Sequence, residues 1–222
     1  MSKETTANPL LTMDGLPPFS QIRPEHVEPA IDFLLADNRQ RIEALLDGLA
    51  APTWDTLVAP IEAWEDRLSR AWSPVGHLNA VMNNEALRAA YNACLPKLSD
   101  YATEMGQNER LFRAYEAVAQ SGAALDEGQR KVLDNALRDF HLSGIDLPPE
   151  QKARFKAISQ ELSQLTSKFE ENLLDATNAW SKQITDETEL AGLPPSARDL
   201  ARQTAEQREL PGWVLTLDFP SY

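Results

Sequence analysis

The fold class is decided by residues 149–184, which read PEQKARFKAISQELSQLTSKFEENLLDATNAWSKQI. Apolar side chains recur here in alternating steps of three and four residues, which is the spacing of one face of an α-helix. At ~1.5 Å per residue the predicted helix is ~50 Å long. The residues on this face are Phe155, Ile158, Leu162, Leu165, Phe169, Leu173, Ala176, Trp180 and Ile184.

We interpret this apolar stripe as part of the core of a helical bundle. A dimeric coiled coil is the alternative, but Phe and Trp are poor residues for a coiled-coil seam and the charged flanks are irregular. The stripe therefore predicts a long helix packed against other helices.

The residues before this stretch predict a series of shorter amphipathic helices. The first runs from Pro24 to about Leu49, because proline suits a first helical turn, where its missing N–H would be unpaired anyway. Further along, Pro60 is expected to kink or divide its helix and Pro96 to bend its helix, since an internal proline removes a hydrogen bond and crowds the preceding turn. Gly144 is expected to end a helix in the left-handed conformation. The predicted starts are Thr53, Ser73, Asn83–Asn84, Asn108 and Leu125 or Asp126.

The residues after the long helix predict one more helix and a strand. Residues 196–210 have a helical pattern, which Pro211–Gly212 breaks. Residues 213–219 then alternate as a β-strand does. A single strand is not stable alone. We expect its partner to be either the N-terminal segment or sequence beyond Tyr222.

The chain is thus predicted to be mainly α, a multi-helix bundle with a short β segment at its C-terminal end. We expect residues 1–22 to form an extended arm, residues 23–210 a helical domain, and residues 211–222 a strand. The arm contains three prolines and little periodicity, and its apolar side chains should pack on the helical body. They are Leu10, Leu11, Leu16, Phe19 and Ile22.

The composition is that of a globular protein that works in a reducing compartment. The 222 residues carry a net charge of −13, which disfavours binding to nucleic acid. No apolar run reaches the ~18 residues of a membrane span, and the first residues lack the apolar core of a secretory signal. The single cysteine, Cys94, excludes an internal disulfide and is expected to be a small buried residue. We therefore expect a cytoplasmic protein with neither nucleic-acid nor membrane partners.

No catalytic motif is visible. The three histidines, His26, His77 and His141, are far apart in sequence, and no His-Glu-x-x-His run could place two zinc ligands on one helix face. We interpret His26 as a surface residue at a helix start and the other two as hydrogen-bonded structural residues. Acidic pairs such as Glu62 with Asp66 or Asp186 with Glu187 are interpreted as solvated helix faces. The residues alone assign no catalytic, cofactor-binding or metal-binding site.

Taken together, several segments resemble the start of the thimet-oligopeptidase family of zinc metallopeptidases. The resemblance covers essentially the whole chain, in order and with similar spacing. The matching segments are Asn8–Leu11, Leu16–Ser20, Pro24–Val27, Ser73–Asn79, Asp134–Phe140, Leu142–Ile145, Leu174–Thr177, Thr185–Glu187, Glu189–Gly192, Leu215–Asp218 and Pro220–Tyr222.

This resemblance implies a helical N-terminal part that forms one wall of a deep, narrow channel. The zinc site of such enzymes lies in the C-terminal half, on a His-Glu-x-x-His helix, and the channel admits short unstructured peptides, including signal-peptide fragments. None of those catalytic positions lies in this sequence, so the resemblance transfers no site residue and implies no zinc bound by this chain. We expect a piece that is inactive alone, that associates with the C-terminal catalytic half, and that self-associates or loses order near Trp213–Tyr222 without it. The alternative is a stand-alone helical module that binds peptides or dimerises.

Overall fold

The computed structural model describes residues 8–221 and is mostly helical. These residues contain seven α-helices and a single two-stranded sheet, close to the C-terminal end. They divide into two compact units, residues 8–164 and residues 165–221. The mainly α fold predicted from the sequence is confirmed. Within the same residues, no helix is both long and apolar enough to cross a membrane.

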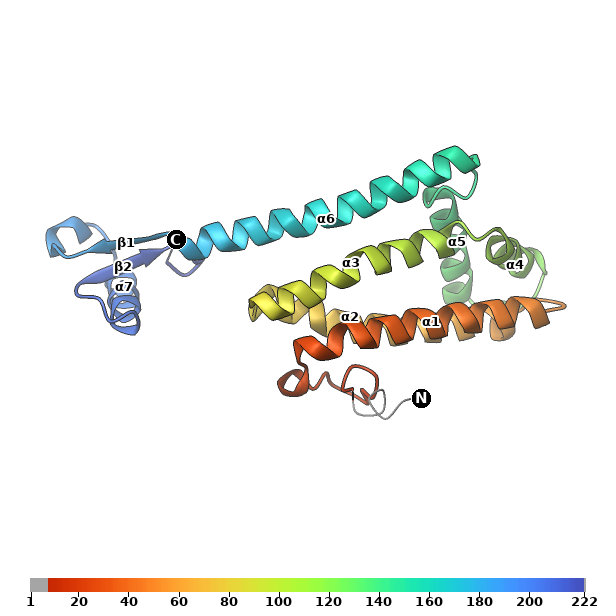
Figure 1. Cartoon of the computed structure of the whole chain (residues 1–222), viewed down its shortest axis with the longest axis horizontal. Coiled ribbons are helices and arrows are strands. Elements are labelled where there is room, and N and C mark those ends of the chain that lie inside the picture. Colours follow the sequence, from red (N-terminus) through yellow and green to blue (C-terminus); the bar gives the residue numbers. More distant parts are fainter. Residues whose placement is uncertain (1–7, 222) are drawn as a thin grey trace. The chain divides into compact units, whose positions relative to one another are not determined.

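Three helices lie side by side at the centre of the first unit (Figure 1): α1 (Pro24–Gly48), α2 (Ala59–Val81) and α3 (Glu85–Gly106). Their apolar faces meet in one buried cluster, to which the N-terminal segment contributes Leu10. Leu16 of the same segment is 91% exposed, so the expectation that it packs on the body is wrong. The buried members from the helices are Val27, Ala30, Ile31, Leu34, Leu35, Leu68, Ala71, Val75, Leu87, Cys94 and Tyr101.

A second buried cluster joins the other ends of α1 and α2 to two shorter helices, α4 (Glu109–Gln120) and α5 (Glu127–Leu142). Both begin where the sequence predicts. Asn108 accepts a hydrogen bond from the backbone N–H of Leu111 at 3.0 Å, and Asp126 accepts one from Gln129 at 2.8 Å. Such caps satisfy backbone donors that have no partner inside the helix.

Two prolines behave differently from one another. Pro60 lies in the first turn of α2, directly after a π-helical turn at Trp54–Val58 that Thr53 caps. The predicted new helix at Ser73 is wrong, because α2 continues through Pro74 to Val81. Pro74 and its neighbour Val75 are buried, so packing outweighs the cost of the lost hydrogen bond.

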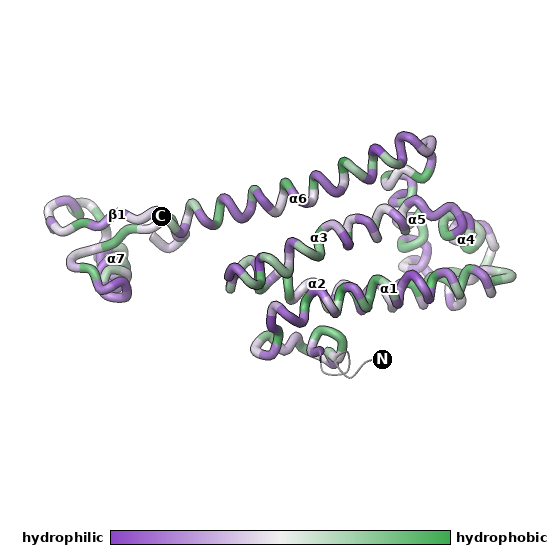
Figure 2. Tube along the Cα trace, viewed as in Figure 1, coloured by the Kyte–Doolittle hydropathy of each residue, from purple (hydrophilic) through white to green (hydrophobic). Residues whose placement is uncertain are grey.

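The long helix α6 runs from Pro149 to Ala179, five residues less than predicted, because residues 181–184 form a strand instead. Its first part belongs to the first unit, where Lys156 pairs with Asp100 of α3 at 3.2 Å. The interpretation of its apolar stripe as bundle core is wrong. Leu162, Leu165, Phe169 and Leu173 are 58–69% exposed, and Figure 2 shows hydrophobic positions recurring along this helix.

The second unit joins the rest of α6 to a small sheet and helix α7 (Pro195–Gln207). Strand β1 (Ser181–Ile184) pairs antiparallel with β2 (Trp213–Thr216), in a register that sets Ile184 opposite Trp213. The strand predicted near residue 213 is therefore present. Its partner is β1, which follows α6, and not the N-terminal segment or sequence beyond Tyr222. Buried side chains of this unit are Ser167, Glu171, Ile184, Leu190, Ala201, Ala205, Val214 and Thr216.

Gly212 makes the turn into β2 possible. It has φ +86°, and a Cβ at this position would collide with the carbonyl oxygen of Ile184. Only glycine meets both conditions without strain.

Candidate functional site

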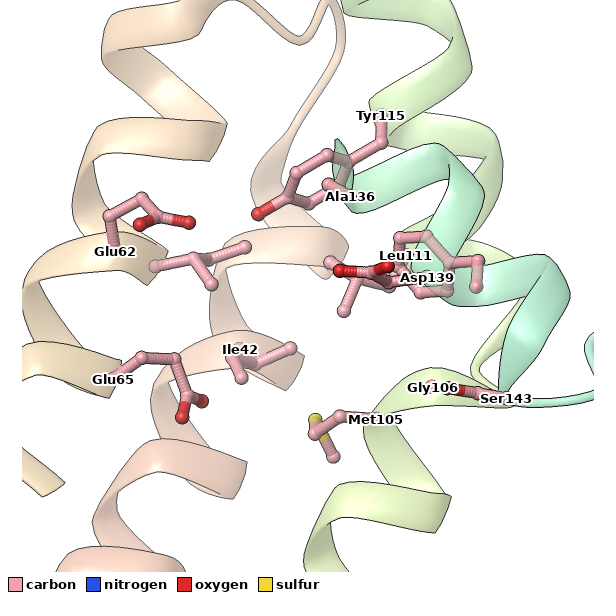
Figure 3. A pocket seen from close by; sticks show the side chains of 12 residues that line it. Ile42, Glu62, Glu65, Met105, Gly106, Leu111, Tyr115, Ala136, Asp139 and Ser143 are labelled. Carbon is pink, nitrogen blue, oxygen red and sulfur yellow. The ribbon is translucent and has the colours of Figure 1, made fainter. Parts of the chain in front are cut away.

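A pocket of about 210 Å³ opens within the first unit, where α1, α2, α4, α5 and the end of α3 converge (Figure 3). It combines an apolar lining with acidic and hydroxyl groups. Its lining residues are Ile42, Ile61, Glu62, Glu65, Met105, Gly106, Leu111, Tyr115, Ala136, Asp139, Phe140 and Ser143.

The apolar part of the pocket is an extension of the second buried cluster. Ile42, Leu111 and Phe140 are buried, and each comes from a different helix. At the rim, Gly106 lies so close to Ser143 that any Cβ on Gly106 would overlap the serine side chain. These contacts fix the walls of the pocket with tightly packed groups.

Two carboxylates of α2, Glu62 and Glu65, enter the pocket from the same side (Figure 3). They are three residues apart and therefore share a helix face. Glu65 accepts a hydrogen bond from the hydroxyl of Tyr101. Burial raises the pKa of Glu65, the Tyr101 hydrogen bond opposes this rise, and the nearby charge of Glu62 adds to it.

Tyr115 of α4 faces these carboxylates. Its side chain is held by an edge-on contact with the ring of Phe140, with the centroids 5.6 Å apart. Only 4% of the residue is exposed, and its hydroxyl points toward Glu62 (Figure 3). Burial raises the pKa of Tyr115, and the charges of Glu62 and Glu65 raise it further. The phenol thus stays protonated and is available as a donor.

The third carboxylate of the pocket, Asp139, is already neutralised in part. Its Oδ1 accepts hydrogen bonds from Nε and Nη2 of the adjacent Arg138, at 2.9 and 2.7 Å. The negative charge of the pocket therefore resides mainly on Glu62 and Glu65.

The three histidines lie on three different helices, α1, α2 and α5. His26 accepts a hydrogen bond from the backbone N–H of Arg23 at 3.1 Å and so completes the cap of α1. His77 lies beside Phe19, and His141 pairs with Asp146 and packs on Phe112. Over residues 8–221 no three His, Cys, Asp or Glu side chains are grouped so as to hold a metal ion.

Cys94 is fully buried in the cluster between α1, α2 and α3. Burial raises the pKa of its thiol to about 11. A buried thiol with so high a pKa is unreactive, as the sequence interpretation of a small core residue predicts.

The sequence does not predict the pocket, because its lining residues come from five helices that are distant in the chain. Of the acidic pair considered beforehand, Glu62 lines the pocket whereas Asp66 is exposed and does not. The available signal is the position of Glu65, which follows Ile61 by four residues and precedes Leu68 by three and so shares their buried helix face.

Comparison with known proteins identifies the class. Residues 31–152 match the N-terminal domain of the neurolysin/thimet oligopeptidase family. This match covers more than half of the chain, so the chain belongs to that family, and the resemblance noted in the sequence is confirmed.

Among individual relatives, the chain is 49% identical to oligopeptidase A of Haemophilus influenzae over 218 residues, which are 97% of this chain and 32% of that protein. It is likewise 49% identical to oligopeptidase A of Escherichia coli, over 97% of this chain and 32% of the relative. A dipeptidyl carboxypeptidase of Salmonella typhimurium is 30% identical over 92% of the chain and 31% of its own length. The chain thus spans about a third of the length of the relatives that it matches.

Proposed function

We propose that this chain is the N-terminal helical domain of a zinc-dependent oligopeptidase that hydrolyses short peptides, including signal-peptide fragments, in the cytoplasm. The observation that carries the proposal is the alignment of 97% of the chain with about a third of each oligopeptidase A. In this proposal the domain forms one wall of the peptide channel, and the remaining two thirds of the enzyme carry the chemistry.

Zinc chemistry is assigned to that remaining part and not to this domain. The three histidines of the chain lie on α1, α2 and α5. Each has a different neighbour: the backbone of Arg23, the ring of Phe19 and the carboxylate of Asp146. This arrangement does not fit a zinc site, which needs three or four ligands converging on one point. The isolated domain is therefore expected to have no peptidase activity.

The exposed stripe of α6 is the surface that we assign to contact with the catalytic part. Side chains such as Leu165 and Phe169 are more exposed than buried, although their spacing is that of a packed helix face. A contiguous exposed apolar patch commonly marks an interface. The occupant that we propose is the polypeptide equivalent to the other two thirds of the relatives.

A chimera tests the proposal. The aligned third of the E. coli oligopeptidase A is replaced by this chain, and cleavage of a short fluorogenic peptide is measured with and without a chelator. We expect chelator-sensitive cleavage by the chimera and none by this chain alone. A folded chimera without cleavage, or chelator-sensitive cleavage by the chain alone, would overturn the proposal.

Variants of the chimera test the interface. Leu165→Glu places a charge in the apolar stripe and should lower activity by separating the two parts, whereas Thr166→Glu adds the same charge at an adjacent exposed residue. Equal activity in both variants would show that the apolar face of α6 is not part of the interface.

The same stripe supports a second candidate, a stand-alone module that dimerises through α6. It predicts a native gene product of 24.7 kDa, the mass of this chain. The intact mass of the product isolated from source cells distinguishes the two, since the first candidate requires a product about three times larger.

A further inference from the structure

We propose that the pocket between α2, α4 and α5 binds a primary ammonium group carried on an apolar stem, as in the side chain of lysine or a free alkylamine. This inference goes beyond the proposed peptidase function, because it requires neither zinc nor the catalytic part.

The hydroxyl of Tyr115 is the observation that points to a ligand. It makes no hydrogen bond with any residue in the part of the chain that the structure describes, although 96% of Tyr115 is shielded from solvent and the hydroxyl points into the pocket. An ammonium group carries only donors, so from within the pocket it can donate a hydrogen bond to the oxygen of this hydroxyl.

The charges around the pocket specify a cation. The carboxylates of Glu62 and Glu65 act together on Tyr115, and the charge of Glu62 also acts on Glu65. Nearby arginines of α1 and α2 are engaged elsewhere: Arg41 and Arg67 both pair with Asp37. Two carboxylates held together at a partly buried site attract a cation more strongly than the same groups in water.

The walls specify an organic cation rather than a metal ion. Ca²⁺ and Mg²⁺ need six or more oxygen ligands. The opposite side of this pocket is built from Ile42, Leu111 and Met105, which offer no oxygen ligand from their side chains. An alkyl stem fits such a wall, and an aromatic ring such as that of Tyr115 attracts an ammonium that lies over its face.

The test is a titration of the chain with n-pentylammonium, followed by calorimetry and by the NMR signals of Tyr115. The neutral isostere 1-pentanol and Mg²⁺ are titrated in parallel. We expect saturable binding of n-pentylammonium only. Equal binding of 1-pentanol would show that the pocket binds apolar groups without regard to charge, and tighter binding of Mg²⁺ would show that it is a metal site. Either result overturns the proposal.

Variants locate the binding. Glu62 is exposed, so Glu62→Gln should leave the fold intact, as circular dichroism will verify, and should weaken binding about tenfold. Tyr115→Phe should weaken it severalfold. Asp66→Asn, which makes the same change in charge on the same helix outside the pocket, should leave it within twofold. The proposal fails if Asp66→Asn and Glu62→Gln have equal effects.

Two further titrations distinguish the sources of the ammonium. N-acetyl-lysine methylamide represents a peptide side chain, and cadaverine represents a free amine. Tighter binding of the lysine derivative assigns the pocket to peptides, and tighter binding of cadaverine assigns it to small amines. Binding of neither compound, while Glu62→Gln behaves as the native chain, would reject both.

Discussion

Tyr101 of α3 donates a hydrogen bond from its hydroxyl to Oε1 of Glu65 on α2. The same hydroxyl accepts a bond from Nδ2 of Asn38 on α1 at 3.4 Å. These two hydrogen bonds connect three helices, and Glu65, at one end of the network, lines the pocket. Asn38 is fully buried, and its Oδ1 has no hydrogen-bond partner among the residues described. The network is therefore only partly satisfied, which makes each remaining bond costly to lose.

Tyr101→Phe should destabilise the chain by about 1–3 kcal/mol, because it leaves the partly buried Glu65 carboxylate without its donor and removes one of the two acceptors of Asn38 Nδ2. Tyr115→Phe is the matched control: both tyrosines are 4% exposed, but the Tyr115 hydroxyl bonds to no described residue. Its removal should change stability by less than about 0.5 kcal/mol. Urea unfolding of the two variants measures the difference, and equal losses would contradict the assignment of the network.

Glu65 should make stability fall with rising pH. Its pKa in the folded chain is raised above 4.5, chiefly by burial, so the folded state holds the proton more tightly than the unfolded state does. This contribution is fully present below the unfolded pKa and is lost as the pH rises through the folded pKa. Glu65→Gln has no such titrating group and should gain stability relative to the native chain as the pH rises from below 4.5 through the folded pKa of Glu65.

The measurement is the difference in unfolding free energy between the native chain and Glu65→Gln across that pH range. Asp66→Asn, an exposed carboxylate of the same helix, controls for the change in overall charge. A difference that does not vary with pH, or one that varies equally in the control, would show that Glu65 is not the group responsible.

The isolated chain should self-associate through the α6 stripe. One face of α6 carries a row of exposed apolar side chains: Leu162, Leu165, Phe169 and Leu173. Burying this apolar surface against a second copy is favoured by the hydrophobic effect. Light scattering should show a mass that rises with concentration for the native chain and for Thr166→Glu. Leu165→Glu should reduce the association. A native chain that remains monomeric at all concentrations would contradict this prediction.

Gly212→Ala should destabilise the pairing of β1 with β2 by more than about 1 kcal/mol, because the new Cβ meets the Ile184 carbonyl at a positive φ. Gly192→Ala is the control that separates the steric contact from the backbone strain. Gly192 also has a positive φ, +92°, but a Cβ there would meet no neighbouring atom. Hydrogen exchange of the amides of residues 181–184 and 213–216 measures the pairing. Faster exchange in both variants to the same extent would attribute the effect to backbone strain alone.

Features that depend on neighbouring residues were predictable from the sequence. Asn108 and Asp126 cap the helices that follow them, and Gly144 ends α5 with φ +83°. Such caps involve groups two to five residues apart, so the sequence contains both partners. The existence of α1, α3 and α6 was predictable for the same reason, since the period of apolar residues is a local property, whereas α2 was predicted as two helices.

Features that depend on distant residues were not predictable. The period of α6 shows that one face is suited to burial, but it does not show what covers that face or that the helix stops at Ala179. Pro74 stays inside α2 because it packs into a core built by other helices. The pocket requires α2 and α4 to place Glu62 and Tyr115 opposite each other, and no spacing along the chain reports that.

The burial of Cys94 gives the domain an internal reporter of its own motions. As the sole thiol in the sequence, it is sealed between α1, α2 and α3 and reacts only when those helices separate. The rate at which a small disulfide reagent modifies it therefore counts opening events of this core, without any added label. The same rate, recorded with and without a partner bound elsewhere on the domain, would show whether binding makes opening of the core less frequent or more frequent.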